Sequence, residues 1–342
     1  MKIAILTPTF AEFSGIDRVV EIEAEDLSKE GNDVTIFCFK ANIKTKYANV
    51  IEIGMPKIQF IERIYRLFFF ADLIKINSIL IKLKGFDKVI CHQYPMTILG
   101  SKAKKKYGLK YVYHNAGVAF PNLFSNPLEK IYMILFNIFT NKSIKNVDEV
   151  ISISNFLRDV LEKETGIKSK VEYIKINKKR FYRGIDGYEI RKRYGFKNEH
   201  ICLYVGRISP HKGIDLLIQS FNLVLKEKPN AKLLIVGKKT FGKYADKLEK
   251  ISKLVSKESI IFTDFVKDED LPKYYSACDV YTTATLWEGF DMPIVEAYSC
   301  GKPSVAFDIG AHPEVIKNGK LIKTGDIVSF SKAILSYIEN QG

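Results

Sequence analysis

Residues 286–307 read LWEGFDMPIVEAYSCGKPSVAF and contain a polar loop, the start of a helix and the strand that follows it. Glu288 lies in the loop, and Glu296 comes eight positions later. The apolar spacing over 293–300 predicts a helix, and residues 302–308 predict a buried strand. Because helices that alternate with strands build parallel sheets, the stretch predicts an α/β fold. It also raises the question of what the two carboxylates hold.

The same alternation continues on the N-terminal side of this stretch, back to about residue 200. It is repeated in the first half of the chain, where the helix predicted over 16–30 stops at Gly31. Two such series imply two doubly wound Rossmann-like domains, each with a parallel sheet covered on both faces. The strands are expected at 2–8, 33–39, 86–93, 109–115 and 148–154 in the first series, and at 200–206, 231–237, 259–265, 279–284 and 302–308 in the second.

The boundary between the two series lies in a charged stretch without strand periodicity, residues 175–195. A chain of 342 residues is too long for one ordinary hydrophobic core. We therefore expect an N-terminal domain over 1–180 and a C-terminal domain over 181–342. Ligands of such sheets bind at the carboxyl ends of the strands, so two facing sheets are expected to form an interdomain cleft.

The composition excludes several classes of protein. Apolar residues make up 46% of the chain, as in an ordinary globular protein, and no apolar run reaches the roughly 18–20 residues that cross a bilayer. The N-terminal MKIAILTPTF lacks a small-residue cleavage site and is not expected to be a signal peptide. Five widely spaced cysteines, none at metal-ligand spacing, predict reduced and mostly buried thiols in a cytoplasmic protein.

The net charge of +14 suits nucleic acid, an anionic membrane or an anionic substrate. No nucleic-acid-binding motif appears, so nucleic acid is not expected as a partner. The loop GRISPHKG, residues 206–213, follows a predicted strand and carries Arg207 and Lys212. Two cations beside the start of a helix favour a diphosphate, although a solvated basic turn is the simpler alternative.

The first predicted strand is followed by EFSGIDR, residues 12–18, where Gly15 precedes a helix. A glycine there lets a ligand approach the backbone closely, although most loops of this kind contain one. The G-x-G-x-x-G fingerprint of dinucleotide-binding domains is missing.

The two glutamates have different simple explanations. Glu296 follows Pro293, which suits the first turn of a helix, so its charge would favour the helix dipole. Its functional alternative is to accept hydrogen bonds from two neighbouring sugar hydroxyls, as in a ribose. Glu288 has no helix to stabilise and is otherwise a surface acid.

Two histidines end predicted strands: His114, before Asn115, and His92, which is the weaker candidate. A histidine at such a position in a cleft can donate a hydrogen bond or accept a proton, and a structural histidine is the alternative. Asp268 and Asp270 form a D-x-D pair, but acids at a helix start need no metal to explain them, so no metal site is expected.

Together these motifs resemble the retaining glycosyltransferases of family four, also called group 1 glycosyltransferases, which have the two-domain GT-B fold. YVGRISPHKGIDLLIQSF resembles the family's phosphate loop, and WEGFDMPIVEAYSCGKPSVAFDIGAHPEVI its E-x(7)-E segment. FSGIDRVV, YHNAG and VISISNFLRD match more loosely. The resemblance implies an acceptor-side first domain and a second domain that binds a nucleotide sugar.

The resemblance also implies a role for each site residue. Arg207 and Lys212 would hold the donor diphosphate, and Glu296 the ribose. The catalytic group would be His114, Arg207, Lys212 and Glu288, and the donor would be bound by Gly15, Arg207, Lys212, Phe265, Val266, Glu288, Gly289, Phe290, Asp291 and Glu296.

The resemblance further implies transfer of a hexose to an acceptor hydroxyl with retention of configuration, and it requires no metal or cofactor. A diphosphate leaving group needs neutralisation of its charge more than protonation, so the two glutamates are not a glycosidase-like pair. The chain departs from the family at Ser14–Gly15, at KINKKRF (175–181) and at GKKTFG (237–242). Because of these departures, the sequence does not predict which residues form the rim of the pocket and the acceptor side.

Two apolar segments with interleaved lysines and arginines, 57–85 and 129–145, have two interpretations. They are either core helices with basic ends or a surface for anionic lipid at the inner face of the membrane. The second interpretation suggests a lipid-linked or polysaccharide acceptor. A nucleotide-sugar epimerase and a non-catalytic subunit that binds nucleotide sugars remain the alternative functions.

Overall fold

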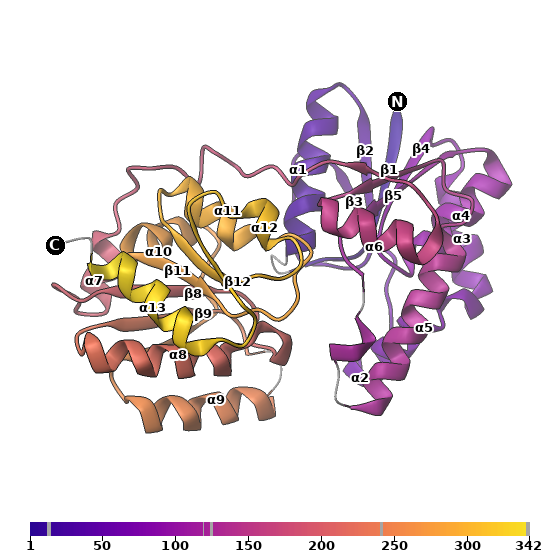
Figure 1. Cartoon of the computed structure of the whole chain (residues 1–342). Helices are drawn as coiled ribbons and strands as arrows, with labels where there is room; N and C mark the ends of the chain where they lie inside the picture. The colour runs from indigo at the N-terminus through magenta and orange to yellow at the C-terminus, as the bar shows by residue number, and fades with distance from the viewer. Residues whose placement is uncertain (12–14, 119, 124–125, 240–241, 340–342) are drawn as a thin grey trace. The chain divides into compact units, whose positions relative to one another are not determined.

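The computed structural model describes residues 1–11, 15–118, 120–123, 126–239 and 242–339 (Figure 1). Contacts divide the chain into two compact units, Met1–Lys175 and Ile176–Gly342. The division falls a few residues before the boundary that we placed at 180.

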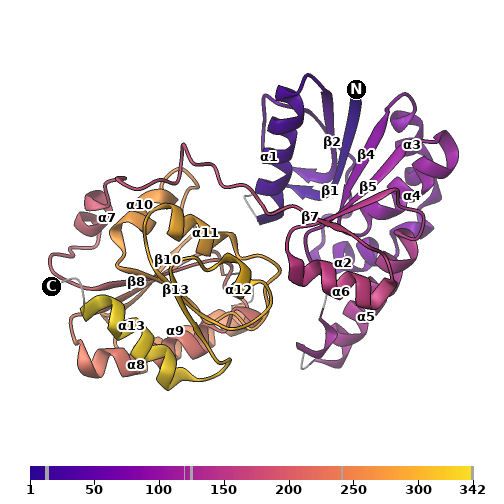
Figure 2. The same ribbon diagram turned by 45° about the horizontal axis from the view of Figure 1, so that its top comes forward.

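The first unit contains one parallel sheet in the order β3-β2-β1-β4-β5-β6-β7 (Figure 2). Its strands are β1 (Lys2–Phe10), β2 (Asp33–Ala41), β3 (Asn49–Glu52), β4 (Lys88–His92), β5 (Lys110–Asn115), β6 (Glu149–Ser152) and β7 (Lys170–Val171). Its α-helices are α1 (Gly15–Lys29), α2 (Gln59–Leu67), α3 (Leu73–Leu83), α4 (Met96–Tyr107), α5 (Pro127–Ser143) and α6 (Asn155–Thr165).

Alternation along the strands of the first unit separates its core into two faces. Ala4 and Leu6 of β1 pack with α3 and α4, whereas Ile5 packs with Val20 of α1. Ile3 lies on the same face as Ile5 and packs with Ile90 of β4 and Val112 of β5. Helices therefore cover both faces, as a parallel sheet requires.

The second unit contains a parallel sheet in the order β10-β9-β8-β11-β12-β13. Its strands are β8 (Ile201–Val205), β9 (Lys232–Val236), β10 (Ile260–Asp264), β11 (Val280–Thr283), β12 (Ser304–Phe307) and β13 (Gly319–Ile322). Its α-helices are α7 (Tyr188–Arg193), α8 (Ile214–Glu227), α9 (Gly242–Val255), α10 (Leu271–Ala277), α11 (Met292–Ser299), α12 (His312–Val315) and α13 (Ile327–Ile338). Leu217 and Phe221 of α8 pack with Phe330 and Ile334 of α13 in the core.

Both sheets have a topological switch point, where the strand order reverses. In the first unit it lies between β1 and β4, and in the second between β8 and β11. The crevice beyond the carboxyl ends of the strands at a switch point is where such sheets bind ligands. The two switch points therefore define the two places where a site is expected.

The structure confirms the strands predicted from apolar runs, and it adds three that we did not predict. These are β3, β7 and β13, which are short edge strands with few buried side chains. An edge strand contacts a neighbour on one side only, so it needs no continuous apolar run. All five cysteines are free and buried, as predicted.

Candidate active site

A glycine positions the cationic loop that follows β8. The chain leaves β8 through a short 3-10 helix, Pro210–Lys212, and reaches Gly213 with φ 59°. A Cβ at Gly213 would lie 2.0 Å from the carbonyl oxygen of Ala284, so only glycine lets the loop pack on the end of β11. The backbone N–H of Leu286 also donates to the carbonyl of His211 at 2.9 Å. These contacts hold the loop after β8 and the loop after β11 together across the switch point.

Lys212 and Glu288 form an ion pair across this switch point, with the Nζ of Lys212 donating to Oε2 of Glu288. Both side chains are largely buried, with 14% and 21% exposed. Burial disfavours the charged lysine, but the carboxylates of Glu288 and Asp291 outweigh it and raise the pKa of Lys212. Burial also opposes the charge of Glu288, and Lys212 lowers the pKa of that carboxyl despite it. The pair stays charged at neutral pH.

A second buried pair supports the loop that carries Glu288. Asp291 adopts a left-handed backbone with φ 67°, and its Oδ2 lies 3.0 Å from Nε2 of His312. The other ring nitrogen of His312, Nδ1, lies 2.7 Å from the carbonyl of Phe307, which only accepts. The N–H of Ala311 donates to the carbonyl of Glu288 at 3.2 Å. Hydrogen bonds from Ala311 and His312 thus fix the position of the loop 288–291.

Arg207 and His211 complete the cationic loop. Arg207 is exposed, and its carbonyl accepts a hydrogen bond from Tyr204 at 3.1 Å. Burial, with the nearby charges of Lys212 and Arg207, lowers the pKa of His211 to about 4, so this ring is neutral at physiological pH. The loop therefore presents one exposed guanidinium and one buried ammonium to a ligand.

Glu296 lies on α11 with no exposed surface, and the hydroxyl of Tyr275 donates to its Oε2 at 2.7 Å. Gly289 and Phe290 are buried, and the N–H of Gly289 lies 3.3 Å from Oε1 of Glu288. Phe265 is exposed after the end of β10, and Val266 is half-buried beside it. The structure brings Lys212, Glu288 and Asp291 together, with Glu296 below the surface.

In the first unit, Gly15 is the first residue of α1, and a Cβ there would meet nothing within 4 Å. Residues 12–14, which precede it in the predicted loop, lie outside the described residues. His114 ends up largely buried beside His92, the other candidate histidine. Their rings are 4.8 Å apart between centroids, and Glu23 of α1 lies against both.

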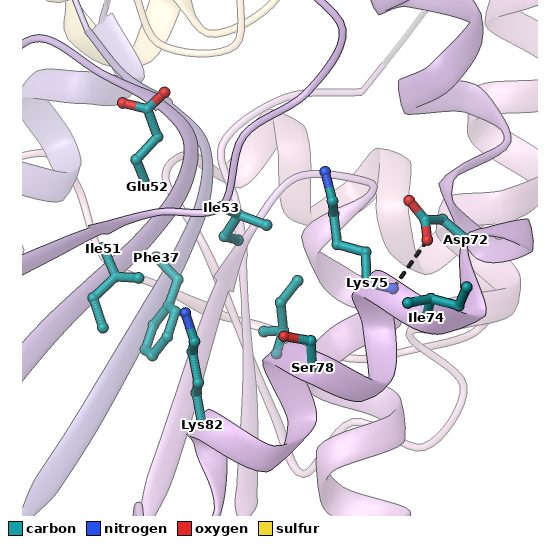
Figure 3. Close-up of a pocket in the computed structure, with 10 residues that line it drawn as sticks. Phe37, Ile51, Glu52, Ile53, Asp72, Ile74, Lys75, Ser78 and Lys82 are labelled. Carbon is teal, nitrogen blue, oxygen red and sulfur yellow. Dashed lines mark hydrogen bonds between the residues drawn. The ribbon is translucent and has the colours of Figure 1, made fainter.

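Two other candidates have a structural explanation. Asp268 of the D-x-D pair forms an ion pair with Arg180, and Asp270 lies 3.5 Å from Lys273. A hollow of about 400 Å³ lies against β2, β3 and α3, and its polar lining residues are Glu52, Asp72, Lys75, Ser78 and Lys82 (Figure 3). Since these elements carry none of the predicted site residues, we assign the hollow no part in the candidate active site.

Three supporting residues were not predicted: Tyr275, His312 and Glu23. Glu23 had a signal, because it lies four residues after Val19 and four before Leu27, on the apolar side of the predicted helix. A glutamate there is unusual and needs a buried partner. Tyr275 and His312 had no comparable signal, since a buried tyrosine and a histidine within a turn are ordinary.

Two family models match the chain. The model described as "Glycosyl transferases group 1" matches residues 187–342, and "Glycosyltransferase Family 4" matches residues 13–175. The two matches fall on the second and the first unit, respectively. No helix in the described part of the chain is both long and apolar enough to span a bilayer.

The chain is also similar to individual proteins. It is 30% identical to mannosylfructose-phosphate synthase of Agrobacterium fabrum over 187 residues, which are 52% of this chain and 41% of that protein. It is 25% identical to alpha-monoglucosyldiacylglycerol synthase of Streptococcus pneumoniae over 334 residues, 90% of this chain and 71% of that protein. The matches span 36% to 41% of the length of the first three curated relatives.

Among solved structures, Anabaena HepE in complex with UDP-glucose superposes with a TM-score of 0.81 and 20% identity, over 99% of this chain and 90% of that chain. This likeness shows the fold. It agrees with the predicted pair of Rossmann-like domains of the GT-B class.

Proposed function

We propose that this chain, whose two halves match the models of group 1 and family 4 glycosyltransferases, transfers a hexosyl group from a nucleoside-diphosphate sugar to an acceptor hydroxyl. The observation that carries this proposal is the buried Lys212–Glu288 pair at the switch point of the second sheet. It places a permanent cation beside a carboxylate that can accept hydrogen bonds from sugar hydroxyls, at the place where an α/β sheet binds ligands.

The cationic loop would stabilise the leaving group. As the bond from the sugar to the diphosphate breaks, negative charge grows on the phosphate oxygens. Lys212 has three N–H donors, so it can bind a phosphate oxygen while it stays beside Glu288. Arg207, exposed on the same loop, would add a planar pair of donors for a second oxygen. These two cations neutralise the departing diphosphate without a proton donor.

The loop 288–291 would bind the transferred sugar. Glu288 accepts hydrogen bonds only, so it suits sugar hydroxyls, and the N–H groups of Gly289, Phe290 and Asp291 suit sugar oxygens. The left-handed backbone at Asp291 turns the chain sharply into α11, and the contacts from Ala311 and His312 fix that turn. A rigid loop of this kind favours one orientation of the sugar. Family resemblance supports retention, with attack on the face from which the diphosphate leaves.

Glu296 and Phe265 would bind the nucleoside. We propose that Glu296 receives the ribose hydroxyls and that the hydroxyl of Tyr275 orients its carboxylate. Because Glu296 has no exposed surface, this contact requires the residues that cover its carboxylate to move when the nucleotide binds. Phe265, exposed at the end of β10, offers an apolar ring to the base.

A thermal-shift screen tests the donor class. The chain is heated with UDP, GDP and their sugars, and the matching nucleotide should raise the melting temperature of the wild type but not of Lys212→Ala. Lys226→Ala, which changes an exposed lysine at the far end of α8, is the matched control and should respond as the wild type does. If the two variants respond equally to every nucleotide, Lys212 is not the diphosphate ligand.

Analysis of the products separates transfer from epimerisation. With the identified donor, a transferase releases nucleoside diphosphate faster when an acceptor is added. An epimerase converts the sugar of the donor without an acceptor, and that result would contradict the proposal.

We further propose that the acceptor is presented at an anionic membrane surface. Helices α2 and α5 lie beside each other and are joined by a two-fold hydrogen-bonded pair, in which Arg63 donates to Glu129 at 2.8 and 2.6 Å (Figures 1 and 2). Together they expose large apolar side chains, which we call the α2–α5 surface: Phe60, Ile61, Ile64, Leu128, Ile131 and Ile134.

Exposed lysines flank the α2–α5 surface, Lys57 before α2 and Lys130 on α5. Apolar side chains among basic ones suit the interface of an anionic bilayer, and the net charge of +14 adds a long-range attraction. The glycolipid named in the Streptococcus relative is consistent with a lipid acceptor. The segment 57–85 also contributes buried residues such as Ile76 and Leu80, so it serves the core as well as this surface.

Co-sedimentation with vesicles tests the membrane proposal. The chain should sediment with vesicles that contain anionic lipid at low salt, and less with purely zwitterionic ones. Ile64→Glu combined with Ile131→Glu should reduce sedimentation while leaving nucleotide binding unchanged. No sedimentation on anionic vesicles at low salt would remove the proposal.

A further inference from the structure

The first unit has a cluster of three buried polar side chains at its own switch point. His92 and His114 are register neighbours on the adjacent parallel strands β4 and β5, so their side chains leave the same face of the sheet. Glu23 reaches them from α1, which covers that face, and its Oε2 lies 2.7 Å from Nε2 of His92. The other oxygen, Oε1, lies 3.5 Å from Nδ1 of His114, which is an ion-pair distance at which no hydrogen bond is formed.

We propose that Glu23 is the positioning residue of His114, holding its ring with Nδ1 toward α1 and Nε2 away from the carboxylate. A carboxylate only accepts hydrogen bonds, so Nε2 of His92 must carry a proton, and the charge of Glu23 favours a proton on the Nδ1 of His114 that faces it. His92 then has its proton on Nε2, and His114 has one on Nδ1. Nε2 of His114 is the nitrogen left for a partner outside the cluster.

The charges around His114 favour its protonated form. Burial alone would favour the neutral ring, but Glu23 opposes it and raises the pKa of His114, with a smaller contribution from Glu172 beyond β7. Lys88 of β4 acts in the opposite direction. For His92 burial dominates and lowers the pKa, and the neighbouring His114 adds to this effect. Beside one carboxylate, the pKa of His114 is therefore raised while burial keeps the pKa of His92 low.

The arrangement would let His114 donate a hydrogen bond during the proposed transfer. This step of the inference rests on the proposed function. A protonated ring with Nδ1 held by Glu23 can donate from Nε2 to an oxygen of the donor or acceptor. Without Glu23 the buried ring would be neutral, and which nitrogen carries the proton would no longer be fixed. Glu23 would not touch the substrate, so it acts only through His114.

A metal ion is a poorer occupant of the cluster. Two ligands of a tetrahedral zinc with bonds of 2.0–2.1 Å lie roughly 3.3 Å apart, whereas Glu23 and His92 are at hydrogen-bond distance. A metal-bound histidine usually donates its second N–H to an acceptor. In the part of the chain that the structure describes, the buried Nδ1 of His92 has no such partner.

The direct test is NMR of the histidine rings, which needs no substrate. Ring nitrogens of the full chain are followed against pH, and the signals of His114 are assigned by their loss in His114→Gln. In the wild type His114 should titrate above its ordinary pKa of 6.5, with Nδ1 protonated in the neutral form. In Glu23→Gln the titration should move to lower pH, whereas in Glu25→Gln, two residues along the same helix at the surface, it should not.

The outcomes separate this inference from the proposed function. Equal titration of His114 in the wild type and Glu23→Gln would overturn it, and so would a stoichiometric metal ion in the purified chain that is lost in Glu23→Gln. If an active donor is found, the pH above which turnover falls should be lower in Glu23→Gln than in the wild type. A variant that only melts earlier, with an unchanged pH profile, would leave Glu23 a structural residue and contradict the proposal.

Discussion

The switch points of the two units are built on the same plan but hold different chemistry. In the second unit each of the two acids at the switch point faces a basic side chain, Glu288 facing Lys212 and Asp291 facing His312. In the first unit one carboxylate, Glu23, serves two imidazoles. The charge of the Lys212–Glu288 pair is therefore fixed across the physiological pH range, whereas that of the first cluster changes within it.

This difference suits the two sides of a transfer reaction. A diphosphate is anionic at every physiological pH, so its binding site gains from a lysine whose charge does not change. The group that meets the sugar or the acceptor gains from a ring that can hold or release a proton.

Lys212→Ala should have the largest effect, because it removes the buried cation of the second switch point. By analogy with the loss of one preorganised charge donor, transfer should slow by about 10²–10³-fold. The measurement is turnover at saturating donor, with Lys226→Ala as the control. Unchanged turnover would show that Lys212 does not stabilise the leaving diphosphate and that the two switch points differ less than proposed.

How far the sequence predicts each switch point depends on how local the site is. The second one is carried by two short stretches, 206–213 and 286–296, and each contains its own loop and helix start. Local rules therefore place Arg207, Lys212 and Glu288 near the ends of neighbouring strands. The first one combines Glu23, His92 and His114 from three distant elements, and no local rule fixes how α1 is rotated over the sheet.

The limits of sequence reasoning for the fold have a similar physical cause. Strands inside a sheet are buried on both faces and show continuous apolar runs, as in β1 and β8, so they were predicted. Edge strands such as β3 and β13 are half exposed and carry no such run. The left-handed backbone at Asp291 was also hidden, since aspartate gives no signal as clear as glycine.

Changes at Asp291 test how much the second switch point gains from the contact between Asp291 and His312. Asp291→Ala leaves the buried ring of His312 without its hydrogen-bond partner and places alanine in a left-handed backbone, so it should lower the free energy of unfolding by about 3 kcal/mol. Asp291→Asn keeps an acceptor and tolerates the left-handed backbone, so it should lose less. Urea unfolding of both variants, with Asp291→Gly to remove backbone strain, gives the comparison. Equal stability of the Asn variant and the wild type would show that the charge of Asp291 contributes nothing to the pair.

Tyr275→Phe tests the second unit below its surface. It removes the hydroxyl that donates to the buried Glu296, a hydrogen bond to a charged group worth about 2 kcal/mol. The free energy of unfolding should fall by that amount, and the affinity for the matching nucleoside diphosphate, measured by calorimetry, should fall as well. A loss of stability with unchanged affinity would separate Glu296 from the nucleotide and leave it a residue of the core.

Glu23→Gln should have the smallest effect, and its size should depend on pH. Glutamine still accepts a hydrogen bond from His92, so only the charge-assisted part is lost, about 1 kcal/mol. Despite opposing burial, the two histidines lower the pKa of Glu23 from 4.5, so its contribution is present above pH 4.5 and is lost as the pH falls. Because the pKa of His114 is raised in the folded state, its charged ring stabilises the fold below pH 6.5, and this contribution is lost as the pH rises.

The stability difference between wild type and Glu23→Gln should therefore be largest between about pH 4.5 and 6.5 and shrink at higher pH. The neutral His92 has the opposite dependence, since folding disfavours its charged form, and it makes both proteins more stable as the pH rises. Urea unfolding at a series of pH values measures the difference directly. A constant difference from pH 5 to 8 would mean that Glu23 holds no charged ring, and the contrast between the two switch points would be lost.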